Sequence, residues 1–227
     1  PLAGAQEGPD LEDPDSQGAY AFGVSIGRTF AGVEAVNLDI DAFMAGMEAA
    51  LGEEELALSD EELAAAAQAF QQKISQARQA EQAEEAQAFL DLNKGEDGVT
   101  ETDSGLQYKV LEEGDGASPA PSDRVRVHYT GTLADGTVFD SSRERGEPVE
   151  FQLGQVIPGW TEGLQLMEEG ARYEFTIPPD LGYGARGRPP QIPGNSVLVF
   201  DVELLDVNPP QEPAQPQRPQ IQLPGQQ

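Results

Sequence analysis

Few side chains in this sequence could perform nucleophilic, redox or metal-assisted chemistry. The chain contains one histidine, His128, and no cysteine, which excludes thiolate nucleophiles and disulfides and argues against a zinc site. His128 lies in an alternating segment on the face opposite Val125 and Val127, so we expect it at the surface rather than as a base or ligand. The glycine-rich run 182–187 lacks the strand-to-helix context of a phosphate-binding loop. The sequence therefore implies neither a metal nor a cofactor.

Aromatic side chains are the more informative feature, because they are concentrated in the C-terminal half of the chain. Some of them must belong to a core, but a concave aromatic pocket with a few polar groups is also the usual form of a ligand site. Asp140 directly follows Phe139, and Trp160 comes shortly after the apolar pair Val156 and Ile157. We therefore expect a ligand pocket built from some of these aromatic residues: Tyr129, Phe139, Phe151, Trp160, Tyr173, Phe175, Tyr183 and Phe200.

Alternating apolar and polar residues predict β-strands from Ser104 onward, and Gly-Asp-Gly, Ala-Asp-Gly and Pro-Gly sequences separate them. One short helix is expected after Pro158, with Trp160, Leu164 and Met167 on the face that covers the sheet. About four or five antiparallel strands and one helix make an α+β domain. The apolar strand positions are Leu106, Tyr108, Val110, Val125, Val127, Tyr129, Tyr173, Phe175, Ile177, Leu198, Phe200, Val202 and Leu204.

Residues 17–93, before this domain, contain no proline and are rich in Ala, Glu and Gln, a composition that favours helix. Phe22, Ile26 and Phe30 recur every four residues and so share one helix face. Ser59 followed by Glu62 forms a capping box, which marks a helix start. The predicted helices are Gln17–Ala31, Asp39–Leu51 and a long third helix from Ser59 to Asn93.

The long third helix changes character along its length. Between Ser75 and Ala88 its only non-polar residues are alanines, and a helix that is polar all round usually bridges separate units through solvent. Gly95 is expected to end the helix, and residues 95–98 to form a hinge. The apolar residues upstream are too few for the core of one chain. We therefore predict a homodimer built on residues 17–74.

Composition limits the partners. The chain has 41 acidic and 13 basic residues and a formal net charge of -28, which disfavours nucleic acid and anionic membrane surfaces. No apolar stretch reaches the roughly 18 residues that a bilayer-spanning helix needs. No signal peptide is recognisable in this chain, which begins at Pro1 without Met. The acidic residues 1–16 and the Pro/Gln-rich residues 208–227 are expected to be disordered.

Four ordered segments within residues 104–207 share the pattern of a known family. They are VRVHYTGTLADGTVFDSS (125–142), QVIPGWTEGLQLM (155–167), IPPDLGYGARG (177–187) and IPGNSVLVFDVELL (192–205). Together they resemble the FK506-binding (FKBP) type of peptidyl-prolyl cis-trans isomerase. The N-terminal arm, from AYAFGVSIG through DIDAFMAGMEAAL to the long helix, is similar to the dimerisation arm of bacterial periplasmic FKBPs such as the macrophage infectivity potentiator. The resemblance implies an antiparallel sheet wrapped on one short helix, preceded by an all-α dimerisation arm.

The resemblance also implies an isomerase, and a set of residues for its pocket. Its substrates would be Xaa-Pro bonds of unfolded or partly folded proteins, turned without any cofactor. Asp140 and Tyr183 would be the catalytic polar members, with Arg145 as a partner of Asp140 and Phe151 in support. The implied substrate-binding residues are Tyr129, Phe139, Val156, Ile157, Trp160, Ile192 and Phe200.

Two rim positions depart from the common family pattern. Val149 stands where many members carry an aromatic residue, and Arg188 where some carry histidine, so both bear on substrate preference and on affinity for macrolides such as rapamycin. The resemblance further implies a periplasmic or outer-membrane-associated location. The predicted organisation is a disordered acidic segment (1–16), a helical dimerisation domain (17–58), a long connecting helix and hinge (59–98), the isomerase domain (99–207) and a disordered tail (208–227).

Two other functions fit the same sequence. The first is a non-catalytic chaperone whose pocket only binds Pro-containing chains, which the helical arm supports and which is compatible with catalysis. The second is an interaction module tethered by its Pro/Gln-rich tail. For Asp140 itself three roles stay open: orienting Tyr129, pairing with Arg145, or acting electrostatically on the twisted amide.

Overall fold

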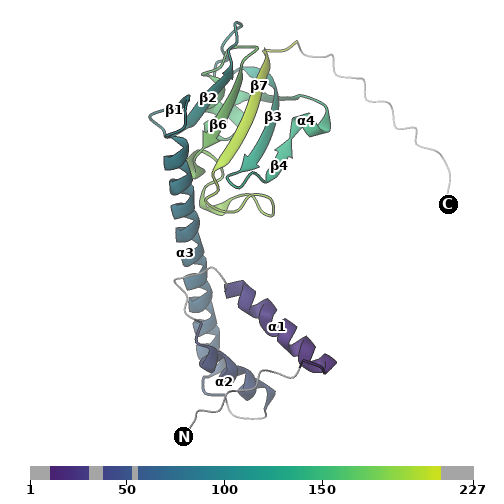
Figure 1. Ribbon diagram of the computed structural model, residues 1–227. Coiled ribbons are helices and arrows are strands. Elements are labelled where there is room, and N and C mark those ends of the chain that lie inside the picture. Colours follow the sequence, from purple (N-terminus) through teal and green to yellow (C-terminus); the bar gives the residue numbers. More distant parts are fainter. Residues whose placement is uncertain (1–10, 31–37, 53–55, 211–227) are drawn as a thin grey trace, which may run out of the picture. The chain divides into compact units, whose positions relative to one another are not determined.

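The computed structural model describes residues 11–30, 38–52 and 56–210, and the chain divides into two compact units after Gln82. The first unit holds α1 (Pro14–Phe30), α2 (Ile40–Leu51) and most of α3 (Asp60–Asn93), and the second holds the end of α3 and the sheet (Figure 1). The tail predicted to be disordered lies outside the described residues from position 211 onward.

Local sequence signals set the starts of α2 and α3 as predicted. Glu62 Oε2 accepts a hydrogen bond from the Ser59 N–H at 2.9 Å, and Ser59 Oγ accepts one from the Glu62 N–H at 3.4 Å, so the capping box is formed. Asp39 caps α2 because its Oδ1 accepts the Ala42 N–H at 3.0 Å. The long helix ends at Asn93, also as predicted.

The start of α1 corrects the prediction. It begins at Pro14 rather than Gln17, so residues 14–16 are helical and not disordered. The cause lies at the residue before the helix, because Asp13 Oδ2 accepts the Ser16 N–H at 2.9 Å. Proline at the first helical position has a suitable φ and no N–H to satisfy. The predicted end at Ala31 lies outside the described residues.

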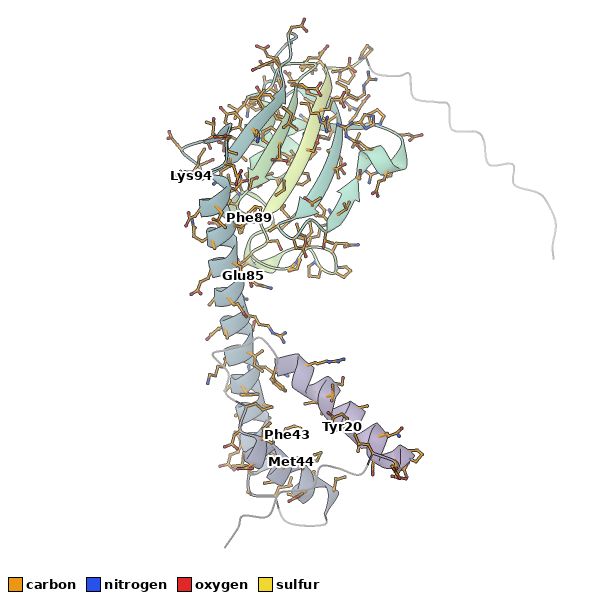
Figure 2. The ribbon with its side chains drawn as sticks, in the orientation of Figure 1. Tyr20, Phe43, Met44, Glu85, Phe89 and Lys94 are labelled. Carbon is orange, nitrogen blue, oxygen red and sulfur yellow. The ribbon has the colours of Figure 1, made fainter. Side chains whose placement is uncertain are left out.

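The first unit has no core of its own: none of its described residues is buried. Phe30 of α1 contacts Phe70 of α3, with ring centroids 5.9 Å apart, yet Phe22 on the same predicted face is 67% exposed. The large apolar side chains that stay exposed on α1 and α2 are Tyr20, Phe22, Ile40, Phe43, Met44, Met47 and Leu51, three of which are labelled in Figure 2. A single copy of this unit therefore leaves its apolar stripe in contact with water.

The second unit is built on an antiparallel sheet in which the described residues form seven strands, more than the sequence predicted. The sheet order is β1-β2-β6-β7-β3-β4, with β5 paired to β3. The additional strands are only three or four residues long, too short to show alternation in the sequence. The strands are β1 (Val99–Glu101), β2 (Gln107–Glu112), β3 (Arg124–Leu133), β4 (Val138–Ser141), β5 (Val149–Gln152), β6 (Arg172–Ile177) and β7 (Leu198–Val207).

Helix α5 (Pro158–Leu164) packs on the sheet as predicted and completes the core. Two glycines allow its close approach: a Cβ on Gly159 would stand 2.6 Å from Ile177, and one on Gly163 would stand 2.7 Å from Phe175. Leu164 is fully buried in the same cluster. The prediction of one short helix missed α4 (Ser142–Arg145), a single turn, because a turn of four residues has no periodicity to detect.

The last turns of α3 belong to the second unit. Ala86 and Leu90 are buried against Val197, with Phe89 packed beside them (Figure 2). The buried amide of Gln107 on β2 donates to the Leu90 carbonyl at 2.9 Å. Its Oε1 accepts from the Asn93 side chain at 2.8 Å. Apolar contact and a satisfied buried amide together fix the end of the helix to the sheet.

In residues 11–30, 38–52 and 56–210, no helix combines the length and the hydrophobicity needed to cross a bilayer.

Candidate active site

A pocket of about 660 Å³ opens in the second unit, walled by strands, helix α5 and the loop between β6 and β7. Aromatic and aliphatic side chains dominate its lining. The lining residues are Tyr129, Phe139, Asp140, Val149, Phe151, Gln155, Val156, Ile157, Trp160, Tyr183, Arg188, Gln191, Ile192 and Phe200. The aromatic side chains therefore surround an open hollow and do not collapse on one another.

Trp160 forms the floor, held by rings that meet it edge to face. Its ring centroid lies 5.1 Å from those of both Tyr129 and Phe200, at interplanar angles of 88° and 83°. Phe139 meets Phe200 at 5.5 Å and 88°. Such T-shaped contacts fix ring orientations as well as positions.

Gly131 on β3 makes this ring arrangement possible. A Cβ at Gly131 would stand 2.6 Å from Phe139 and 2.7 Å from Phe200, closer than real side chains come. Any larger residue there would push the two rings into the pocket. A glycine in the middle of a ten-residue strand costs stability, and here it lets two rings approach the backbone.

The surroundings of the Trp160 indole are dry. Trp160 is 6% exposed, and its Nε1 has no hydrogen-bond partner in the described part of the chain. Phe151 adds a third ring at 5.2 Å, so the indole is enclosed by aromatic carbon. A weak contact between an N–H and a ring face is the remaining way to satisfy such a group. The floor thus offers an apolar ring face to a ligand.

Asp140, Tyr129 and Arg145 form a hydrogen-bonded group at one wall. Asp140 accepts short hydrogen bonds from the Tyr129 hydroxyl and from Arg145, and Arg145 Nη2 lies 3.2 Å from the Tyr129 oxygen. The single-turn helix α4 supplies Arg145, and it stops at Gly146 in the left-handed conformation (φ 77°). This turn brings the guanidinium back to a carboxylate five residues earlier.

The electrostatics of this group fix its charge at neutral pH. Burial raises the pKa of the Tyr129 hydroxyl above its ordinary value, and the hydrogen bond to Asp140 adds to this despite the opposing Arg145. Burial alone would also raise the pKa of Asp140, but the hydrogen bonds from Tyr129 and Arg145, with the Arg145 charge, outweigh it and lower that pKa. At neutral pH Asp140 is therefore a carboxylate and Tyr129 a neutral phenol.

Two further hydrogen-bond donors line the pocket, and they differ from the Asp140, Tyr129 and Arg145 group because they have no partner in the described part of the chain. The Tyr183 hydroxyl and the Ile157 amide take part in no hydrogen bond within residues that the structure describes. Ile157 precedes the first residue of α5, where backbone N–H groups have no helical partner. Tyr183 is half-buried in the loop after β6. An apolar floor flanked by two open donors suits a ligand with carbonyl groups.

The structure brings every residue predicted for substrate binding and catalysis to this one pocket. Arg145 does not line the pocket but forms an ion pair with Asp140. Val149 and Arg188, the two residues that differ from the common family pattern, both line the pocket. His128 is outside it, 3.1 Å from Ser142 Oγ. Gln155 and Gln191 also line the pocket, and they were not predictable from the sequence because isolated polar loop residues follow no pattern.

Comparison with family models covers nearly the whole chain. Residues 116–205 match the model of the FKBP-type peptidyl-prolyl cis-trans isomerase. Residues 15–110 match the model of the domain amino-terminal to that isomerase. The two matches thus include the pocket and most of the helical arm.

Individual proteins give the same result. The FKBP-type 22 kDa peptidyl-prolyl cis-trans isomerase of Escherichia coli is 43% identical over 202 residues, covering 88% of this chain and 98% of that protein. The outer membrane protein MIP of Legionella longbeachae is 39% identical over 196 residues, covering 83% and 84%. The crystal structure of FkpA from Escherichia coli superposes with a TM-score of 0.61 at 41% identity, covering 87% of this chain and 98% of that one.

Proposed function

This chain belongs to the family of FKBP-type peptidyl-prolyl cis-trans isomerases, and from that premise we propose how its pocket turns Xaa-Pro bonds. The relatives decide between the functions that the sequence left open: the chain is an isomerase of Xaa-Pro bonds in proteins, not a binding module alone. The observation that carries the mechanism is an open pocket with a dry aromatic floor and two unpaired donors.

Rotation about an Xaa-Pro bond is slow because it breaks amide resonance, a barrier of about 18–20 kcal/mol. Resonance places negative charge on the oxygen and positive charge on the nitrogen, and this separation is largely lost at the twisted transition state. Water therefore stabilises the planar ground state more than the transition state. An apolar pocket removes that difference, and each ~1.4 kcal/mol gained accelerates rotation about tenfold.

Different residues of the pocket bind different parts of the substrate. The pyrrolidine ring lies on Trp160, among Tyr129, Phe139 and Phe200, while Val156 and Ile192 close the sides. The Tyr183 hydroxyl and the Ile157 amide donate to carbonyl groups on either side of the rotating bond. One end of the substrate is thereby held while the other turns.

Asp140 acts in two ways within this proposal. Its carboxylate holds the Tyr129 phenol and Arg145 in place, which sets the shape of the wall. Its negative charge also lines the pocket, where it acts on the carbonyl carbon of the twisted amide, which becomes more electron-poor when rotation removes donation from the nitrogen. The lowered pKa of Asp140 keeps that charge present at neutral pH.

An assay of a chromogenic Xaa-Pro peptide tests these roles. Asp140→Leu and Tyr183→Ala are each expected to lower kcat/KM by at least about tenfold, the effect of losing one transition-state contact. Tyr183→Phe separates loss of the hydroxyl from loss of the ring, and Asp140→Asn separates charge from shape. Circular dichroism confirms that each variant is folded. Full activity in Asp140→Leu and Tyr183→Ala would remove both residues from the mechanism.

We further propose that the chain is a homodimer through residues 17–74. The first unit exposes its apolar stripe and buries no described residue, so a second copy supplies the missing core. Sedimentation at micromolar concentration tests this proposal. A single species with the mass of one chain would contradict it.

A chaperone role and a location complete the proposal. Two pockets carried by one dimer present paired binding sites to a partly folded client, so suppression of aggregation is expected to survive in Asp140→Leu.

The relative named as an outer membrane protein supports a periplasmic or outer-membrane-associated location for this chain. From the same aromatic floor we expect macrolides such as rapamycin to bind in this pocket and to inhibit isomerisation.

A further inference from the structure

Arg188 gives the rim of the pocket a positive charge that the isomerase mechanism does not use. It is exposed, it lines the pocket, and its guanidinium carbon lies 6.0 Å from the centre of the Tyr183 ring. That ring carries one of the two open donors. A substrate bonded to Tyr183 therefore passes close to this charge.

The backbone fixes the position of Arg188. Its N–H donates to the Ile192 carbonyl at 2.7 Å, and the Ile192 N–H donates back at 3.1 Å. Ile192 is 3% exposed in the pocket wall, so the loop between these residues is closed on a rigid base. Gly187 precedes it with φ 60°, and a Cβ there would stand 2.3 Å from the carbonyls of Ile192 and Pro193. The arginine is thus anchored at the rim.

Within residues 11–30, 38–52 and 56–210, no carboxylate neutralises the charge of Arg188. Acidic residues outnumber basic ones by 41 to 13 in this chain, so most basic groups should find a carboxylate. Half of the described basic residues do so, namely Lys94, Arg124, Arg126, Arg143, Arg145 and Arg172, and among the other described ones only Arg188 lines the pocket. Arg188 takes part in no ion pair among the described residues. The other charged group of the lining, Asp140, is already paired with Arg145.

The pocket is large enough for the neighbours of a bound proline. At about 660 Å³ it exceeds what one pyrrolidine ring fills, so flanking residues lie within it or at its rim. Consecutive Cα atoms are about 3.8 Å apart, and the long arginine side chain can reach the side chain of an adjacent residue. A carboxylate there would meet a guanidinium that can bind it through two hydrogen bonds.

We propose that Arg188 is a specificity-determining residue that selects Xaa-Pro segments with Asp or Glu next to the proline. The proposal rests on the isomerase function of the same pocket and adds the class of substrate. The rest of this strongly acidic protein repels acidic clients at long range, and that repulsion is screened beyond about 8–10 Å at physiological salt. An ion pair in direct contact, between Arg188 and a substrate carboxylate, persists at physiological salt. It offsets the repulsion at the rim of the pocket, next to the Xaa-Pro bond that rotates.

The experiment compares charged and neutral peptides of equal size in the full-length protein. Isomerisation of Glu-Pro and Gln-Pro peptides, and of Pro-Glu and Pro-Gln peptides, is followed by exchange NMR in wild type, Arg188→Gln and Arg186→Gln. Arg186 is the matched control, because it lies two residues away, is exposed, and does not line the pocket. Both variants change the net charge equally, so only a local effect can separate them.

In one of the two peptide pairs, the Glu/Gln ratio of kcat/KM is expected to fall about twofold to fivefold in Arg188→Gln, the range of an exposed ion pair. The same ratio should stay at the wild-type value in Arg186→Gln, and Arg188→Glu should lower it further than Arg188→Gln does. Equal ratios in wild type and Arg188→Gln for both peptide pairs, or equal losses in both glutamine variants, would overturn the selectivity. Wild type that is inactive on all four peptides would instead overturn the isomerase function itself, which keeps the two failures distinct.

Discussion

The two units of this chain place similar apolar side chains in opposite environments, one away from water and the other exposed to it. In the second unit they are packed away from water, as Phe175, Leu164 and Ile177 show with exposures of 1% or less. In the first unit Phe22 and Leu51 are 67% and 84% exposed, and none of the described residues is buried. The difference lies in what the backbone can build. A sheet with a covering helix encloses a volume, whereas three helices with few large side chains do not.

This contrast separates two sources of stability. The isomerase unit is stabilised by its own core, because one chain suffices to bury that core. If the proposed dimer forms, the arm depends on a second chain, and its stability should vary with protein concentration. The activity of the pocket is then independent of assembly, while the arrangement of two pockets is not.

The largest expected effect comes from the core. Phe175→Ala removes a ring that is 1% exposed and packed against Gly163, and should lower the free energy of unfolding of the isomerase unit by about 3–5 kcal/mol. Urea denaturation followed by Trp160 fluorescence measures this loss. A change below about 1 kcal/mol would mean that the core is less continuous than its burial indicates.

The same substitution in the arm should have a different result. Phe22→Ala is expected to weaken dimerisation by about tenfold or more, the cost of removing one interface aromatic, and to leave the isomerase unit as stable as before. Sedimentation over a concentration series gives the dissociation constant. Tyr20→Ala and Phe43→Ala repeat the test on α1 and α2. Unchanged association in all three variants would place the interface elsewhere on the arm.

Acid is expected to have a smaller effect, and it distinguishes stability from activity. The pKa of Asp140 is lowered from 3.8 in the folded state, so its stabilising contribution is complete above pH 3.8 and is lost as pH falls below that value. Thermal stability of the isomerase unit should therefore fall only below about pH 4. Asp140→Asn should flatten that decline, and a wild-type midpoint that is constant down to pH 2 would contradict the linkage.

The rate should respond to pH even less. The pKa of Tyr129 is raised above 10.0 and that of Asp140 lowered below 3.8, so neither group of the wall changes charge near neutrality. A constant kcat/KM between about pH 5 and 9 is expected from a mechanism without proton transfer. A bell-shaped profile in this range would indicate acid-base chemistry that the pocket residues do not suggest.

How much the sequence predicted depends on how local each signal is. The start of α3 was predictable because the capping box of Ser59 and Glu62 involves only neighbouring residues. Strands β3 and β7 were predictable from alternation over ten residues each. The short β4, β5 and α4 were not, because they exist only through pairing with β3 or through a cap, and no period fits in four residues.

The candidate site was predictable by another route. Its residues come from separate strands, a helix and a loop, and elementary patterns could not say which aromatics face a pocket and which fill the core. Tyr173 and Phe175 belong to the core, whereas Trp160 and Phe200 belong to both core and pocket. Family resemblance supplied that assignment. It could not show that Arg188 has no ion-pair partner among the described residues, because that depends on where the carboxylates of this particular chain lie.

The hydrogen bond and apolar contacts that join the end of α3 to the sheet determine where a fragment that contains only the isomerase unit can begin. A fragment starting at residue 99 would strip Leu90 from Val197, which is 2% exposed, and would deprive the buried Gln107 amide of its carbonyl acceptor. Val197 adjoins β7, the strand that carries Phe200. Limited proteolysis should accordingly spare residues 83–207, and a soluble fragment that keeps the isomerase unit intact should begin at residue 83.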